Sequence, residues 1–103
     1  GGFPDNIPRI LPDSVDAHLD LSSIPVLPVF KWLAQIGGVN ADEMLRTFNC
    51  GIGMIVVCAA DDRVEVERAL VAAGEAPVTL GNLIPTKNGP TRVHYSGAAN
   101  FSA

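Results

Sequence analysis

The fold and the candidate site both depend on one stretch, Arg46-Thr47-Phe48-Asn49-Cys50-Gly51-Ile52-Gly53-Met54. A helix is predicted to end near Thr47, and a short turn then presents Thr47, Asn49 and Cys50 on the surface. Gly51 and Gly53 flank Ile52 at the start of residues 52–59, which are almost continuously apolar and rich in β-branched side chains. Because a half-covered strand alternates apolar and polar residues, this unbroken run predicts a central strand buried on both faces.

Upstream of this stretch, the sequence predicts one half-buried strand among three helices. The strand is indicated by strict alternation of apolar and polar residues over 15–21. This alternation places Val15, Ala17, Leu19 and Leu21 on one face. The helices follow from prolines at first-turn positions, from capping-box spacing between Asn40 and Glu43, and from a closing glycine pair. They are expected over residues 4–11, 28–36 and 40–47.

Downstream of residue 59, the pattern predicts another helix and two more strands. The helix begins at Asp61 or Asp62 and buries a stripe formed by Val66, Ala69, Leu70 and Ala73. The strands are expected over 78–84 and 91–95, joined by a hairpin turn at 87–90. Gly81, inside the first of them, indicates a bulge or a close approach of another backbone.

These elements predict an α/β (α+β) domain, with a mixed, mainly antiparallel four-stranded sheet and helices packed on it. We assign residues 1–95 to this domain and residues 96–103 to a frayed tail, because the tail is small and polar. The chain begins with glycine in mid-motif, which we interpret as a cut end.

Composition excludes several classes of function. The net charge is −4 and the seven basic residues are scattered, so a nucleic-acid-binding face is not expected. No apolar run approaches the roughly 20 residues that span a bilayer, and the first residues lack the charged-then-apolar pattern of a signal peptide, so we expect a cytoplasmic protein. Only 17% of residues are charged, against about a quarter in typical domains. This deficit predicts that part of the surface faces another protein layer.

The cysteines and histidines give no obvious catalytic set. Cys50 and Cys58 do not have metal or redox spacing, so two reduced, buried thiols are expected. His18 and His94 lie on the polar phase of their strands, where solvent-facing side chains are expected. Asp16 and Asp20 share the outer face with His18 and should likewise be solvated.

Two segments are candidates for ligand binding from their residues alone. Gly1-Gly2 before a helix would let backbone amides approach a phosphate, although two glycines at a terminus are also common as remnants of an expression tag. At the start of the predicted central strand, Thr47 and Asn49 offer hydrogen-bonding groups where ligands often bind. They can equally serve only the turn. Arg46 can bind an anion or pair with Asp42.

Together, the two segments resemble one enzyme family, phosphoribosylformylglycinamidine cyclo-ligase, also called aminoimidazole ribonucleotide synthetase. Residues 1–12 resemble its glycine-rich entry and N-x-P-R-x-L-P stretch, and residues 43–54 resemble its E-M-x-R-T-F-N-C-G-x-G-M signature. Residues 29–33 resemble its V/I-F-x-W-L helix, and Gly74-Glu75 and Leu80-Gly81 fall at family positions. The likeness covers residues 1–95 and identifies the chain as the later part of that family's C-terminal domain.

The resemblance implies an activity that the residues alone do not show. Family members use ATP and Mg²⁺ to close the imidazole ring of formylglycinamidine ribonucleotide in purine biosynthesis, and they are cytoplasmic homodimers. The implied partners are the missing N-terminal half of the same enzyme and small-molecule nucleotides, and the chain alone should be inactive.

The resemblance also assigns site residues. It places Gly1, Gly2, Asn6 and Arg9 on the phosphate or substrate, and it places Arg46, Thr47, Asn49, Cys50 and Gly51 in the lining of the cleft. No catalytic residue and no metal ligand is assigned in this chain.

Two alternatives stay open. The chain could belong to a related enzyme, such as formylglycinamidine synthase or a thiamine monophosphate kinase, although the stretch at 48–51 favours the cyclo-ligase. It could also be a non-enzymatic α/β ligand-binding module, which would be a complete domain with no large exposed apolar patch.

Overall fold

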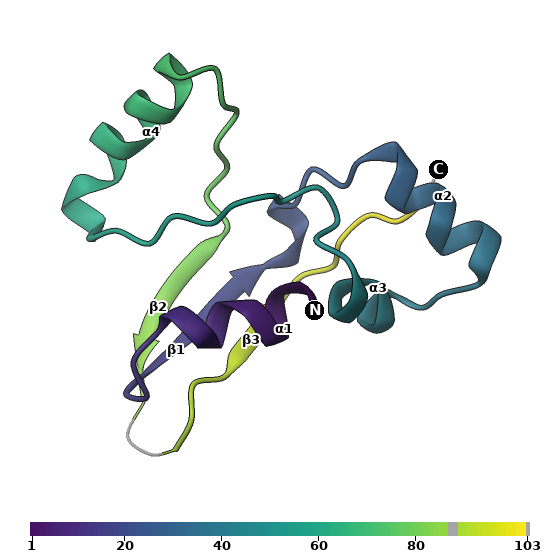
Figure 1. The fold of residues 1–103 in the computed structure, drawn as a ribbon, viewed down its shortest axis with the longest axis horizontal. Coiled ribbons are helices and arrows are strands. Elements are labelled where there is room, and N and C mark those ends of the chain that lie inside the picture. Colours follow the sequence, from purple (N-terminus) through teal and green to yellow (C-terminus); the bar gives the residue numbers. More distant parts are fainter. Residues whose placement is uncertain (87–88, 103) are drawn as a thin grey trace.

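The computed structural model describes residues 1–86 and 89–102, and a three-stranded mixed sheet lies at its centre (Figure 1). The strands are β1 (Val15–Asp20), β2 (Gly81–Pro85) and β3 (Val93–Ser96), in the order β2-β1-β3. β2 runs antiparallel to β1, and β3 runs parallel to it. The alternating stretch is therefore the central strand, with Ala17 and Leu19 buried.

The prediction of a fourth, central strand at residues 52–59 is wrong. The described part of the chain forms three strands, and residues 52–59 belong to none of them. Met54 in this segment is 84% exposed. The apolar pattern predicts that both faces of the segment are buried by other parts of the protein. It does not predict which helices or strands bury them. β1 takes the central place because its amide and carbonyl groups find partners on both edges.

The predicted hairpin is also wrong, because β2 and β3 lie on opposite sides of β1 and do not pair with each other. The turn predicted at 87–90 falls partly on residues 87–88, outside the described ranges. The strands themselves lie within a few residues of the predicted ranges 78–84 and 91–95.

The helices form where the sequence predicts them. Pro28 opens α2 and Gly38, at φ 61°, ends it in the left-handed conformation. The side chain of Asn40 accepts a hydrogen bond of 2.9 Å from the Glu43 amide, which caps α3 as predicted. Helices within the described residues are all too short or too polar to cross a membrane. The elements are α1 (Gly2–Asn6), η1 (Ile7–Ile10), η2 (Leu21–Ser23), α2 (Pro28–Gly37), α3 (Ala41–Thr47), η3 (Ala60–Asp62) and α4 (Arg63–Ala72).

The core lies between one face of the sheet and the pair α1 and α3. α1 crosses in front of the sheet, and the N-terminal end of α1 contacts α3 (Figure 1). Met44 and Cys50 are fully buried, and Leu45 is nearly so. The core therefore sits directly beneath the stretch from residue 46 to residue 54. Its buried members are Phe3, Ile7, Ala17, Leu19, Leu21, Ile24, Ala34, Met44, Leu45 and Cys50.

α4 stands away from this core (Figure 1). Its main neighbouring element is η3, which directly precedes it. Val66 and Leu70 of the predicted inner stripe are half-buried, while Ala69 and Ala73 are exposed. The prediction that this stripe packs on the sheet is therefore wrong in this structure. A helix of 10 residues gains most of its stability from packing, and α4 has no sheet beneath it in this structure.

The outer face of the sheet holds one carboxylate that is buried, not solvated as predicted. Asp16 is 7% exposed. One carboxylate oxygen lies 2.8 Å from His94 Nε2, and the other accepts a 2.9 Å hydrogen bond from the Arg92 amide. The His94 contact and then the Arg92 amide hold the pKa of Asp16 below its ordinary value of 3.8. Asp16 thereby ties β3 to β1, while His94 itself is exposed as predicted.

The segment after β3, predicted as a frayed tail, contacts the rest of the molecule. Residues 97–102 have no regular structure and extend toward α2 (Figure 1). The Gln35 side chain donates a 3.3 Å hydrogen bond to the Phe101 carbonyl. Ala99 and Phe101 are partly buried against the core.

Candidate functional site

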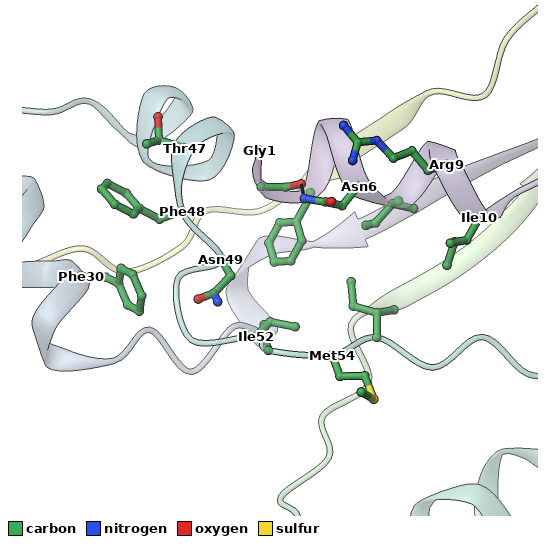
Figure 2. A pocket seen from close by; sticks show the side chains of 15 residues that line it. Gly1, Asn6, Arg9, Ile10, Phe30, Thr47, Phe48, Asn49, Ile52 and Met54 are labelled. Carbon is green, nitrogen blue, oxygen red and sulfur yellow. Dashed lines mark hydrogen bonds between the residues drawn. The ribbon is translucent and has the colours of Figure 1, made fainter.

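An open groove of about 750 Å³ lies between the α1–η1 segment and the chain that follows α3 (Figure 2). Asn6 and Arg9 come from one side, and Thr47 and Asn49 come from the other. Between them the lining is mainly apolar, with contributions from α2 and from the segment after Gly51. These apolar side chains are Phe3, Ile7, Ile10, Phe30, Phe48, Ile52, Met54 and Ile55.

The groove brings together residues from both predicted binding segments, which are some forty positions apart in the sequence. Its lining includes Gly1, Gly2, Asn6 and Arg9 from the first segment and Thr47 and Asn49 from the second. Arg46, Cys50 and Gly51 belong to the same predicted set but do not line it. The structure thus shows the shared location, and the binding roles stay predictions.

The first side of the groove is held by a close contact between α1 and α3. Gly2 has φ 66°, and a Cβ atom there would overlap the Leu45 carbonyl oxygen. Asn6 Nδ2 donates a 2.8 Å hydrogen bond to the Gly2 carbonyl. Glycine is therefore required at position 2 for the packing of α1 against α3, independently of any ligand. The Asn6 amide nitrogen is already used in a hydrogen bond within α1.

The second side is a turn built by Asn49. The Asn49 carboxamide oxygen accepts a 2.9 Å hydrogen bond from the Gly51 amide, and its main-chain carbonyl accepts one of 3.0 Å from the Ile52 amide. The turn uses the oxygen of this side chain, so the nitrogen is the part of Asn49 that can serve a ligand. The two roles left open by the sequence, turn residue and ligand residue, are thus compatible.

Cys50 supports this turn from below. Cys50 is fully buried, which confirms the prediction of a buried thiol and shows that the prediction of a surface position in the turn is wrong. Its backbone is left-handed, with φ 57°, and its thiol lies 3.8 Å from the carbonyl oxygens of Met44 and Phe48. Burial raises the pKa of the Cys50 thiol, which disfavours the nucleophilic thiolate. Cys50 therefore has a packing role here.

For Cys58 the prediction of a buried thiol is wrong, because the residue is exposed. Under native conditions we expect an aromatic disulfide reagent to modify Cys58 rapidly and Cys50 only after unfolding, because the thiolate must be accessible to react. Reagent absorbance should report one thiol per folded chain and two in denaturant. A Cys58→Ser variant that still reacts at once would contradict the burial of Cys50.

Arg46 lies outside the groove on the exposed face of α3. Its Nη1 atom lies 3.8 Å from Glu43 Oε2, one turn back, and not next to Asp42 as the sequence suggested. Both side chains are largely exposed, so this pair contributes little to stability.

No metal centre forms within residues 1–86 and 89–102, where groups of three or more suitable histidine, cysteine or carboxylate side chains are absent. The described groove lining also contains no carboxylate. Mg²⁺ prefers carboxylate and phosphate oxygens, so the residues present do not fit a protein-held Mg²⁺ site.

Sequence reasoning missed the apolar part of the groove. Phe30 and Phe48 stack at a tilt of 54° with ring centroids 5.8 Å apart, and Phe30 comes from the helix at 28–37. The helical pattern predicts Phe30 only as a packing residue, and only the path of the chain places it beside Phe48 and Ile52 (Figure 2). The missed signal is the aromatic residue directly before Asn49.

The structure is an α/β domain with an open, largely apolar groove that has a polar rim. The family model described as AIR synthase related protein, C-terminal domain, matches residues 1–93. The chain therefore belongs to this family. Members of this superfamily are generally ATP-dependent enzymes.

Proposed function

We propose that this chain is part of an ATP-dependent cyclo-ligase that closes the imidazole ring of formylglycinamidine ribonucleotide to aminoimidazole ribonucleotide. The observation that carries the proposal is the groove, where Gly1–Arg9 and Thr47–Asn49 face the same space. These two segments are also the ones that resemble the cyclo-ligase signatures. Family membership supports an ATP-dependent enzyme, and the stretch at 48–51 supports this particular reaction.

The groove suits an anionic ligand with an apolar portion. The Arg9 guanidinium is exposed at its rim and offers charge-assisted hydrogen bonds to a phosphate. Thr47 and the nitrogen of Asn49 would orient polar atoms of a nucleotide, while Phe30, Phe48 and Ile52 would exclude water. These are positioning and charge-neutralising roles, which phosphoryl transfer mainly requires.

ATP, when bound, would activate the formyl oxygen of the substrate by phosphorylation. Because the groove offers no carboxylate, we propose that any Mg²⁺ ligands come from outside this chain. The same reasoning assigns the remaining catalytic groups to the N-terminal half of the enzyme. The full protein would then act as a cytoplasmic homodimer in purine biosynthesis.

The test uses the full-length protein that contains this chain, carrying Arg9→Ala. Losing a charge-assisted hydrogen bond costs about 1.5–3 kcal/mol, so we expect kcat/KM for ATP-dependent ring closure to fall roughly 10- to 150-fold. Arg9→Lys should restore part of the loss. Arg68→Ala, on the exposed side of α4, is the matched control and should leave kinetics unchanged.

The same protein should be assayed for formylglycinamidine synthase and thiamine monophosphate kinase reactions. Turnover of either in place of ring closure would sink the assigned reaction. The 103-residue chain alone should show no ring closure, and full turnover by it would show that the proposed division of the active site is wrong.

A further inference from the structure

Two asparagine side chains line the groove from its two sides, and the fold uses a different atom of each (Figure 2). Asn6, on α1, donates through Nδ2 to the Gly2 carbonyl at 2.8 Å. Asn49, in the turn after α3, accepts through Oδ1 from the Gly51 amide at 2.9 Å. A backbone carbonyl can only accept and a backbone amide can only donate, so these partners fix which end of each carboxamide they engage.

The two carboxamides therefore leave opposite groups for a ligand. Both residues are exposed, and among the hydrogen bonds of residues 1–86 and 89–102 none engages Asn6 Oδ1 or Asn49 Nδ2. Asn6 thus offers an acceptor on the α1 side, and Asn49 offers a donor on the side of the turn. This arrangement favours a ligand that presents a donor to α1 and an acceptor to the turn, because the reverse orientation would set like groups against each other.

Arg9 places the anionic end of such a ligand on the α1 side. It follows Asn6 by three residues and is the one charged side chain in the described lining of the groove. A phosphate bound by Arg9 leaves the far end of the ligand to meet Asn49. In formylglycinamidine ribonucleotide the phosphate and the formyl oxygen lie at opposite ends, and the ribose hydroxyls, which can donate, lie near the phosphate. The groups along this substrate therefore follow the same order as their partners across the groove.

We propose that Asn49 Nδ2 donates a hydrogen bond to the formyl oxygen of the substrate, while Asn6 Oδ1 accepts one from a ribose hydroxyl and Arg9 binds the phosphate. The assignment rests on the proposed function and deepens it, since it gives the orientation of the substrate. The Gly51 amide holds the Asn49 carboxamide before any ligand arrives, which lowers the entropic cost of the contact. Asn49 is thereby a specificity-determining residue, because a ligand without an acceptor at this end leaves the donor unpaired.

Calorimetric titration of the full-length protein tests the contact with two ligands. One is formylglycinamidine ribonucleotide without ATP, and the other is ribose 5-phosphate, which lacks the formyl arm. Asn49→Asp keeps an oxygen for the Gly51 amide but replaces the Nδ2 donor by an acceptor. We expect this variant to raise Kd for the ribonucleotide at least about tenfold and to leave Kd for ribose 5-phosphate within about twofold. Arg9→Ala should weaken the binding of both ligands.

A matched control separates the loss of the donor from other effects of the substitution. Asn100 Oδ1 also accepts a 2.9 Å hydrogen bond from the amide two residues later, but Asn100 is not part of the groove lining. Asn100→Asp should therefore leave both Kd values unchanged. Thermal unfolding should show that Asn49→Asp keeps the melting temperature of the wild type. Asn6→Asp should lower it, because that variant loses the donor to the Gly2 carbonyl.

The outcomes distinguish this contact from the reaction itself. An unchanged Kd for the ribonucleotide in Asn49→Asp, or equal weakening of both ligands by this variant, would overturn the contact with the formyl oxygen. So would a wild-type protein that does not bind the ribonucleotide. Ring closure by the wild type is measured separately and decides the proposed function. The expected pattern of Kd values without turnover would support the contact and contradict the reaction.

Discussion

Gly81→Ala is expected to lower the free energy of unfolding by about 3 kcal/mol, the upper range for a steric insertion into a packed site. Gly81 lies opposite Leu19 in the antiparallel β1–β2 pair. An added Cβ would overlap the His18 carbonyl oxygen and lie 2.9 Å from the Leu19 Cα atom. Both are backbone atoms of the central strand, so neither can move aside as a flexible side chain would. Urea unfolding followed by circular dichroism measures the change.

Gly53→Ala is the matched control for this prediction. Gly53 follows the turn built by Asn49, and a Cβ there meets no atom within 4 Å. Its φ is outside the left-handed region, so alanine is tolerated and stability should change by less than about 0.5 kcal/mol. Equal stabilities for the two variants would show that β2 does not approach β1 as closely as the structure has it.

Met44→Ala is expected to cost about 2–5 kcal/mol, because it empties a fully buried site that neighbouring side chains fill only in part. Met44 lies on α3, where its carbonyl accepts hydrogen bonds from the Phe48 amide and the Cys50 thiol. The cavity would form directly beneath the turn that presents Thr47 and Asn49. We therefore expect faster hydrogen exchange at the Phe48 and Gly51 amides as well as a lower unfolding midpoint.

Two variants separate the cavity from other effects of this change. Met54→Ala makes the same substitution at an 84% exposed side chain and should be close to neutral. Met44→Leu nearly preserves volume and should cost less than about 1.5 kcal/mol. If Met44→Ala proves as mild as Met54→Ala, the core does not lie where the structure places it.

The elements that sequence reasoning predicts correctly are those whose signals are local. The Asn40 cap, the Gly38 stop and the alternation over 15–21 act within a few residues, so each shows directly in the pattern. The close approach at Gly81 is confirmed for a related reason. A glycine in an otherwise β-branched strand indicates that something approaches the backbone, even though the sequence does not name it.

The candidate site is predictable from the sequence as two segments but not as one groove. Resemblance and hydrogen-bonding chemistry are enough to single out Asn6, Arg9, Thr47 and Asn49. Nothing in their spacing requires the two segments to meet, and the helical pattern assigns Phe30 only to packing. For Cys50 the sequence supports both a surface position in the turn and a buried thiol, and only the folded turn, with Cys50 in the left-handed conformation, shows that the thiol is buried.

By itself, the sequence determined where helices begin and end, which face of β1 is buried and which residues offer hydrogen bonds to a ligand. Those properties depend on neighbours three or four positions away along the chain. Only the tertiary structure decided that β1 is the central strand, that Asp16 is buried, that residues 56–59 are exposed and that α4 stands away from the core. Strand partners and buried surfaces depend on contacts between segments that are distant in the sequence. An apolar pattern predicts that a segment is buried, but it does not identify the segment that packs against it.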